Sequence, residues 1–252
     1  MTWIGHATAL IRMGDRWVLT DPAMTRSVGP APFRVSRLAP ARPSIEELPP
    51  IDAILISHGD HDHLDWPTLR RLARRNPDAT VFVPLRNAPL VEAAGFRDVR
   101  ELDWYERDRL GDLEIVAVPA KHGLRRPLLQ LNAMLWGGYV LRHRGSALYF
   151  AGDTGFDTFF QDMRRRVGPV DVALVPIGAY EPRDLQKDFH TTPEEAAEIG
   201  RTLGARIAIG VHWGTFPLSA DAPVEQKSRF LAATGRGVST RTLRVGETLV
   251  LR

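Results

Sequence analysis

Short apolar runs recur along the chain and are separated by polar turns rich in Gly, Pro and Asp. Runs of four to eight apolar residues between such turns are typical of buried β-strands. The N-terminal residues also enter a strand-like segment at once. We predict further strands at 8–12, 17–20, 53–57, 80–84, 113–118, 138–142, 147–150, 170–176, 206–211 and 242–251. The strands at 139–141 and 147–150 are predicted to form a hairpin across residues 142–146.

Helical patterns lie between these strands. Residues 66–75 place Leu69 and Leu72 on one face and arginines on the other, which is typical of an amphipathic helix. Thr192 is a good helix cap, since Pro follows it directly and Glu195 completes a capping box. That helix is predicted to run to about residue 203, where a glycine stops it. Further helices are predicted at 157–167 and 224–233.

The order of these elements favours one class of fold. Some strands are joined by hairpins and others alternate with helices, which favours an α/β sandwich over a doubly wound sheet. We expect a single domain over residues 1–252. Residues 24–50 form the longest stretch without clear periodicity. This stretch is a candidate active-site flap, with a packed surface loop as the alternative.

Composition narrows the classes of function. The chain has 252 residues, 44% hydrophobic and 25% charged, and it contains no cysteine. Disulfides and Cys-bound zinc are therefore excluded, and any metal must be held by His, Asp or Glu. The net charge is +3 without a long basic block, so we expect no nucleic-acid partner. The arginine cluster at 164–166 is interpreted as a solvated helix face, with a phosphate role as the alternative.

The N-terminal residues predict the cellular location. They lack the basic region and cleavage site of a signal peptide, and no stretch is long and apolar enough to span a bilayer. We therefore expect a cytoplasmic protein without a transmembrane segment. Peripheral contact with a membrane stays open, as does the oligomeric state.

One polar run carries the clearest chemistry. Residues 58–65, directly after the predicted strand at 53–57, contain three histidines and three aspartates. So many imidazoles and carboxylates would be costly in a core and are unusual for a surface loop. Imidazole nitrogens and carboxylate oxygens are ligands that divalent transition metals prefer where no thiolate is available. The run therefore predicts a metal site.

Four other positions repeat this design, with a His or Asp just beyond a predicted strand or close to one. A lone histidine at such a place is usually structural. Several of them together indicate ligands that converge on one metal centre. These positions are His122, Asp153, His190 and His212.

The ordered series from His58 to His212 resembles the metallo-β-lactamase superfamily of dinuclear metallohydrolases. Further blocks resemble its N-acyl-phosphatidylethanolamine phospholipase D-like branch, including 3–8, 19–22, 48–53, 62–65, 178–183, 193–196 and 212–216. These blocks are spread over nearly the full chain. The resemblance implies a four-layer αββα sandwich, in which two mixed β-sheets are flanked by helices and the metals lie at one edge.

The resemblance also implies roles for individual residues. One divalent metal would take His58, Asp60 and His122, and the other Asp62, His63 and His212. Asp153 would bridge the pair. His190 would stand near the centre as a proton donor or substrate ligand. Supporting roles, with packing or turn capping as the alternative, are implied for His6, Asp21 and Asp65.

Asp60 departs from the family pattern His-x-His-x-Asp-His, which has a histidine at this position. A rival register that begins at His61 also matches three of four ligands, but the surrounding residues fit only the register that begins at His58. A carboxylate at position 60 would make the site formally neutral once two divalent ions and a hydroxide are bound. We expect two zinc ions, with Mn²⁺ or Fe²⁺ as alternatives because an oxygen ligand favours harder metals.

These residues together predict a metal-dependent hydrolase that uses a metal-bridging hydroxide. Asp62 and His190 are the predicted catalytic residues, and His61, Arg125 and Arg183 are candidates for binding substrate. The resemblance favours a phosphodiesterase acting on a phospholipid-like or small phosphodiester, and thus an anionic small-molecule or lipid-like substrate. A lactonase of the ascorbate-phosphate lactonase type and a catalytically silent metal-binding or scaffold protein are the alternatives.

Overall fold

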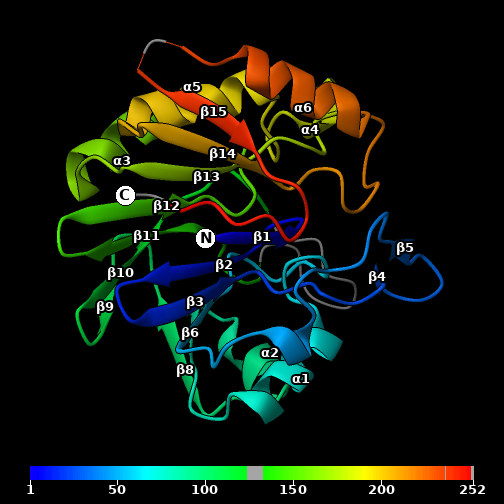
Figure 1. Cartoon of the computed structure of the whole chain (residues 1–252), viewed down its shortest axis with the longest axis vertical. Helices are drawn as coiled ribbons and strands as arrows, with labels where there is room; N and C mark the ends of the chain where they lie inside the picture. Colours follow the sequence, from blue (N-terminus) through cyan, green and yellow to red (C-terminus); the bar gives the residue numbers. More distant parts are fainter. Residues whose placement is uncertain (124–132, 236, 251–252) are drawn as a thin grey trace.

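Two β-sheets pack face to face between two layers of helices, as Figure 1 shows from top to bottom. The computed structural model describes residues 1–123, 133–235 and 237–250. Helices α3 (Phe159–Val167), α5 (Pro193–Leu203) and α6 (Pro223–Ala232) cover one sheet. Helices α1 (Trp66–Arg75) and α2 (Ala88–Glu92) cover the other. The αββα sandwich with two mixed sheets is confirmed.

One sheet has six strands over the described part of the chain. Its first three strands are antiparallel, and the strands after β3 pair in parallel. Its order is β1 (Thr2–Gly5), β2 (Thr8–Met13), β3 (Arg16–Thr20), β6 (Ala53–Leu55), β7 (Thr80–Pro84) and β8 (Asp98–Leu102).

The facing sheet has seven strands in the described ranges. It is parallel from β12 to β15 and antiparallel from β9 to β12. Its order is β15 (Ser239–Thr242), β14 (Ile207–Val211), β13 (Val172–Pro176), β12 (Ser146–Phe150), β11 (Gly138–His143), β10 (Leu113–Val118) and β9 (Arg107–Leu110).

The predicted hairpin is present as β11 and β12. Its strands are longer than predicted, since His143 pairs with Ser146. Only Arg144 and Gly145 remain in the turn, with φ of 45° and 85°. Positive φ at both central residues is the geometry that suits a two-residue hairpin, and glycine adopts it without strain.

Alternating side chains build the core. In β10, Ile115 and Ala117 point into the space between the sheets, whereas Val116 and Val118 pack toward the outer helices. On the other side, Leu69 and Leu72 of α1 pack against the outer face of the six-stranded sheet. Strands that are buried on both faces have continuous apolar sequences. The short central strands could therefore be predicted from sequence.

The predicted strand at 242–251 is wrong over most of its length. The strand β15 ends at Thr242, and the chain then crosses to the edge of the other sheet, with a turn at Gly246 (φ 84°). There Trp3 N–H donates to the Glu247 carbonyl at 3.1 Å, and Leu249 N–H donates to the Met1 carbonyl at 2.8 Å. The apolar pattern here reflects contact with both sheets. Residue 251 lies outside the described residues.

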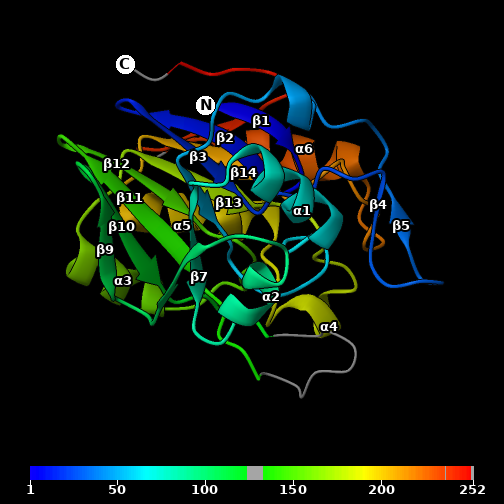
Figure 2. The same ribbon diagram turned by 90° about the horizontal axis from the view of Figure 1, so that it is seen from below.

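Residues 24–50 form a short two-stranded hairpin, β4 (Ser27–Val28) with β5 (Val35–Ser36), and a 3₁₀ turn, η1 (Ile45–Glu47). The hairpin extends from the body of the molecule in Figures 1 and 2. Arg37 anchors its base, because the guanidinium donates to the carbonyls of Ile4 at 3.1 Å and Ala23 at 2.5 Å. A short helix, α4 (Arg183–Gln186), lies before α5. No helix among the described residues could cross a membrane.

Candidate metal centre

Loops that follow strand ends carry the polar side chains of this centre. The loop between β6 and α1 meets the loops after β10, β12 and β14 of the facing sheet. Their donor atoms form overlapping groups, within each of which the atoms lie no more than 4.8 Å apart. These groups contain all seven residues predicted as metal ligands: His58, Asp60, Asp62, His63, His122, Asp153 and His212.

The first group consists of His58, Asp60 and His122. The Oδ2 atom of Asp60 lies 3.6 Å from His58 Nε2 and 3.7 Å from His122 Nε2. The rings of His58 and His122 are 4.5 Å apart and inclined at 72°. Two imidazole nitrogens therefore face one carboxylate, which is a donor set suited to a divalent transition metal.

The second group consists of Asp62, His63, His212 and His6. The Oδ2 atom of Asp62 lies 3.4 Å from His63 Nε2 and 3.6 Å from His212 Nε2. His6 Nε2 is closer to the same oxygen, at 2.9 Å. His6, which the sequence indicated only as a supporting residue, therefore contacts a predicted ligand directly.

Asp153 lies between the two groups. Its Oδ2 atom is 3.2 Å from His63 Nε2, 3.1 Å from His212 Nε2 and 4.0 Å from His58 Nε2. Its other oxygen, Oδ1, is buried and has no hydrogen-bond partner among the described residues. This position is the one that a carboxylate shared by two metals would need.

Hydrogen bonds on the outer side of the centre orient the imidazoles. His63 Nδ1 donates to Asp21 Oδ2 at 2.6 Å, and the Ser57 hydroxyl donates to the same oxygen at 2.5 Å. His58 Nδ1 lies 2.8 Å from that hydroxyl, and His122 Nδ1 donates to a backbone carbonyl at 3.2 Å. Because the Nδ1 atoms of His58, His63 and His122 are engaged outward, their Nε2 atoms face the centre, as metal-binding histidines require.

Inside the centre, buried donor atoms have no ordinary partner. The Nε2 atoms of His58, His63, His122 and His212 lack a hydrogen-bond partner within the described part of the chain. An unpartnered buried polar atom costs about 1–3 kcal/mol, so four of them at one place need an explanation. Divalent cations would satisfy these nitrogens and the carboxylates between them. The residues present therefore fit a metal centre.

Backbone strain is concentrated in the same loops. His6, Asp21 and His212 have φ values of 55°, 30° and 57°. Such values are uncommon for residues other than glycine, and they persist where the surrounding structure enforces them. The fold thus holds His6, His212 and Asp21 in backbone conformations that are unfavourable for residues other than glycine.

The carboxylates and imidazoles of the centre shift one another's pKa values strongly. Burial opposes ionisation of Asp62 and Asp153, but the imidazoles of His63 and His212 outweigh it and hold the pKa of both carboxyls well below its usual value. Burial also opposes protonation of His212, yet Asp153 and Asp62 raise its pKa to about 9. The pKa of His63 is raised well above its usual value in the same way. The centre without metal therefore retains protons that a cation would have to displace.

His190, the predicted proton donor, lies beside Asp153 and His212. Its Nδ1 atom is 3.8 Å from Asp153 Oδ2 and has no hydrogen-bond partner among the described residues. Burial lowers the pKa of His190 to about 3, so the ring is neutral at pH 7. A neutral imidazole keeps one N–H that can donate to a bound oxygen.

The predicted substrate-binding residues have different surroundings. Arg183 donates to both carboxylate oxygens of Glu195, at 2.7 and 2.6 Å, and to the His190 carbonyl at 2.7 Å. His61 is half-buried in the loop before α1 and belongs to none of the metal-suited groups of the described residues. Arg125 lies outside the described residues. A role in binding substrate stays a prediction for all three.

Asp65 has a local role at the start of α1. Its carboxylate accepts a hydrogen bond from the Thr68 hydroxyl at 2.5 Å. The groups formed by the described residues contain neither Asp65 nor His61, so the register that begins at His58 is the one that forms a cluster.

Two supporting groups were not anticipated. The Ser57 hydroxyl, which links His58 to Asp21, could have been noticed because it directly precedes the first histidine. The carbonyl that orients His122 belongs to Phe189, more than sixty positions along the chain. No sequence pattern reports such a backbone contact.

Comparisons with known proteins agree with this geometry. A β-lactamase superfamily domain matches residues 16–213. An N-acyl-phosphatidylethanolamine-hydrolyzing phospholipase D of Caenorhabditis elegans is 36% identical over 233 residues, which cover 86% of this chain and 64% of the relative. A metal-dependent hydrolase of Methanopyrus kandleri is 29% identical over 251 residues. This match covers 98% of this chain and 97% of the relative.

A solved structure supports the fold. The metallo hydrolase Igni18 from Ignicoccus hospitalis superposes with a TM-score of 0.74 at 22% identity, covering 98% of this chain and 96% of that one. The nematode relative is longer, and this chain spans less than two thirds of its length.

Proposed function

Because the chain belongs to the β-lactamase superfamily and is a metal-dependent hydrolase of that superfamily, we propose that it holds two divalent cations and hydrolyses phosphodiesters. The observation that carries this proposal is the set of buried, unpartnered imidazole nitrogens that converge on three carboxylates. His58, Asp60 and His122 would hold one cation, and Asp62, His63 and His212 the other. Asp153 would contact both.

The cations, when bound, would supply an activated hydroxide and polarise the phosphoryl or carbonyl oxygen. Asp62 would orient the nucleophile, since its carboxylate is fixed by His6 at 2.9 Å. His190 would present an N–H toward the leaving oxygen. Its backbone carbonyl is held by Arg183, which makes Arg183 a positioning residue as well as a candidate substrate contact.

Charge favours a diester over more highly charged phosphates. Two divalent cations, a hydroxide and the carboxylates of Asp62 and Asp153 would leave one positive charge, and Asp60 removes it. A neutral centre attracts anions less strongly, which suits a substrate with one negative charge or none. We propose zinc as the resident metal, with Mn²⁺ or Fe²⁺ as alternatives because Asp60 adds an oxygen ligand.

An apolar cavity beside the centre favours a substrate with an apolar part. It has a volume of about 260 Å³ and is lined by His212 together with Leu38, Phe216, Pro217 and Leu218. Leu38 belongs to the 24–50 segment and is 59% exposed, so this segment could close over the cavity as a flap. A phospholipid-like diester is our first candidate, in keeping with the name of the nematode relative.

The same neutral centre suits a lactone, whose carbonyl carries no charge. A lactonase is therefore the second candidate function. Comparing kcat/KM on phosphodiesters with kcat/KM on lactones distinguishes the two functions. A silent metal-binding protein is the third, and it predicts bound metal without turnover of either class.

The test combines metal content with hydrolysis. Freshly purified protein should hold about two metals per chain and hydrolyse bis(p-nitrophenyl) phosphate in a chelator-sensitive way. Asp62→Asn should lower kcat at least about a hundredfold, as expected for a group that orients the nucleophile. The exposed Asp78→Asn is the matched control and should keep wild-type activity. Full turnover in Asp62→Asn would show that this centre is not the source of the activity, and no turnover with zinc, manganese or iron supplied would refute the phosphodiesterase.

A further inference from the structure

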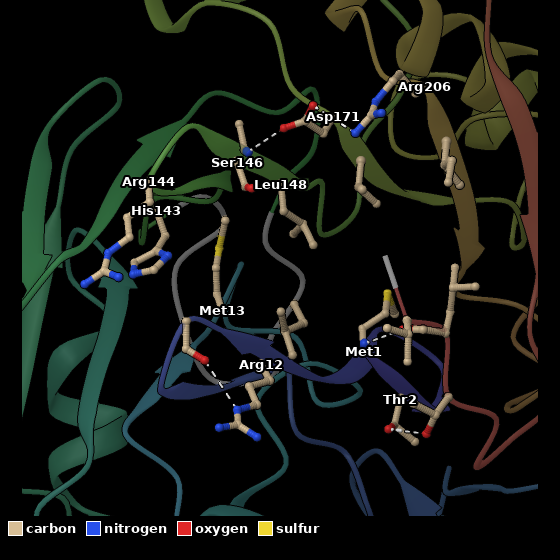
Figure 3. A pocket seen from close by; sticks show the side chains of 18 of the residues that line it. Met1, Thr2, Arg12, Met13, His143, Arg144, Ser146, Leu148, Asp171 and Arg206 are labelled. Atoms are coloured by element: carbon tan, nitrogen blue, oxygen red, sulfur yellow. Dashed lines mark hydrogen bonds and ion pairs between the residues drawn. The ribbon is translucent and has the colours of Figure 1, made fainter. Parts of the chain in front are cut away.

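A second, larger cleft opens between the two sheets, with a volume of about 1010 Å³ (Figure 3). Its wall includes the β11–β12 turn and the residues at which β13 and β14 begin. The metal-centre loops follow the other ends of β12 and β14. The cleft therefore lies at the edge of the sandwich opposite the metal centre.

The interior of the cleft is apolar. Ile11 and Met13 of one sheet face Leu148 and Val172 of the other, and all four belong to the core between the sheets. Figure 3 shows the side chains of Met13 and Leu148 directed into the cleft from opposite walls. The cleft is thus an open end of the inter-sheet core, and an aliphatic chain that enters it would take its own apolar surface out of water.

The rim is basic. Arg12, Arg144, Arg206 and Arg241 line the cleft, against one carboxylate, Asp171, among the described lining residues. Asp171 accepts a hydrogen bond from the Ala147 N–H at 2.8 Å and pairs with Arg206 at 3.4 Å, so its charge is already engaged.

Two of these arginines are well placed to meet a ligand. Arg144 pairs only with Asp112 in the described structure, at 3.0 Å, and both side chains are about seventy per cent exposed. Such exposed pairs contribute little and exchange readily for another anion. Arg241 is exposed, and no ion pair is found for it in the described ranges. The rim therefore carries an excess of positive charge over an apolar interior.

We propose that this cleft binds a single-chain anionic amphiphile, with its aliphatic chain between the sheets and its carboxylate or phosphate head at the arginine rim. A polar anion would make no use of the apolar lining, and a neutral lipid would leave the charge of Arg241, which has no ion pair in the described ranges, without an anion. The volume is at the upper end of the range of about 300–1,000 Å³ usual for small-molecule sites, which suits a long chain. This binding does not depend on the proposed hydrolysis.

Methionine methyl groups provide a local readout. Among the five methionines of the chain, Met1 and Met13 line the cleft, whereas Met163 lies in α3 and Met24 lies three residues after Asp21 on the metal side. In protein labelled with ¹³C at the methionine methyls, dodecanoate below its micelle concentration should shift the Met13 signal and leave those of Met24 and Met163 in place. Dodecyl phosphate distinguishes a phosphate head from a carboxylate head, and dodecyltrimethylammonium should cause no shift.

Variants test the two halves of the cleft. The double variant Arg144→Gln, Arg241→Gln should weaken dodecanoate binding, measured by calorimetry, by about tenfold or more, as expected when charged hydrogen bonds are lost. Ser146→Trp, at an exposed lining position, should block entry without disturbing the core. The matched control is Arg74→Gln on α1, outside the cleft, which should bind like wild type.

Other outcomes would overturn the proposal. An unshifted Met13 at saturating dodecanoate, or equal binding by the cationic amphiphile, would show that the cleft is not this site. Loss of binding in Asp62→Asn with retention in the arginine double variant would place the amphiphile at the metal centre instead. Retention in Asp62→Asn and loss in the double variant supports the cleft whether or not the protein hydrolyses phosphodiesters.

Discussion

Asp60 and Asp21 are two carboxylates of the centre that lie on different sides of the histidine rings. Asp60 faces the imidazoles of His58 and His122 from inside, at 3.6 and 3.7 Å. Asp21 is fully buried behind His63. Its carboxylate accepts hydrogen bonds from the His63 ring and from the Ser57 hydroxyl. Asp60 would therefore set the charge and hardness of the proposed donor set, and Asp21 fixes the orientation of the His63 ring.

Asp60→His tests the inner carboxylate. A third imidazole in the first group should raise preference for zinc over manganese and make the centre more positive. We expect the zinc-to-manganese affinity ratio to rise by about tenfold or more, measured by competition between the two metals in chelator-buffered solution. An unchanged ratio would mean that Asp60 does not bind the metal. Asp78→Asn is the control for a surface carboxylate.

Asp21→Asn tests the outer carboxylate. An amide accepts more weakly and carries no charge, so His63 would lose part of its orientation. Loss of such an outer partner typically lowers metal affinity about 10–100-fold. Zinc affinity, measured with a chromophoric chelator, should fall by that amount. Asp65→Asn, which changes a buried carboxylate that accepts from the Thr68 hydroxyl at the start of α1, should leave zinc affinity within about twofold of wild type.

Helix α5 shows how much of an element its sequence specifies. Thr192 accepts from the Glu195 N–H at 3.3 Å, and Glu195 accepts from the Thr192 N–H at 2.9 Å, so the predicted capping box is confirmed. The helix ends before Gly204, as predicted, with φ of 79° at that glycine. Local hydrogen bonds fix such boundaries, and sequence can therefore report them.

Glu195 has a second partner that the sequence did not reveal. Its carboxylate also binds Arg183, which in turn holds the His190 carbonyl, so the start of α5 is tied to the segment that carries His190. The contact depends on where α4 lies.

Strands β8 and β9 were missed for a related reason: they are polar edge strands whose partners, and not their own residues, define them.

Glu195→Gln tests this tie. Loss of the ion pair with Arg183 should lower the free energy of unfolding by at most about 1 kcal/mol, because the amide oxygen of Gln can still accept from the Thr192 N–H. It should also lower kcat on bis(p-nitrophenyl) phosphate more than it raises KM, because His190 would be held less firmly. Glu198→Gln lies on the same helix and breaks a half-buried pair with Arg201, away from His190, so it should leave kcat unchanged. Equal effects of the two variants would contradict a positioning role.

At the scale of the whole molecule, the metal centre joins the two sheets. His58 and His63 follow a strand of the six-stranded sheet, whereas His122, Asp153 and His212 follow strands of the seven-stranded sheet. The sequence predicted these side chains at strand ends but could not give their distances, because the packing of one sheet on the other sets them. A cation between them should act as a cross-link between the sheets.

Metal removal should therefore change both stability and its pH dependence. A cation at a hundred times its Kd adds about 2.7 kcal/mol to the unfolding free energy. Without metal, the raised pKa values of His63 and His212 stabilise the fold fully below pH 6.5, and this contribution is lost as pH rises through about 9. In chelator, the urea midpoint should fall over that window, and added zinc should restore it at pH 9. A midpoint that is independent of pH in chelator would contradict this account.

The crossing of the chain after β15 has a consequence for synthesis. The backbone of Met1 is hydrogen-bonded to Leu249, so these contacts join residues 248 positions apart. On the ribosome, the outer edge of β1 is covered only after residues 247–249 have been synthesised. His6 and His212 likewise meet only late. A nascent chain that stops before His212 would therefore have neither the outer edge of β1 covered nor the donor set of the candidate metal centre complete.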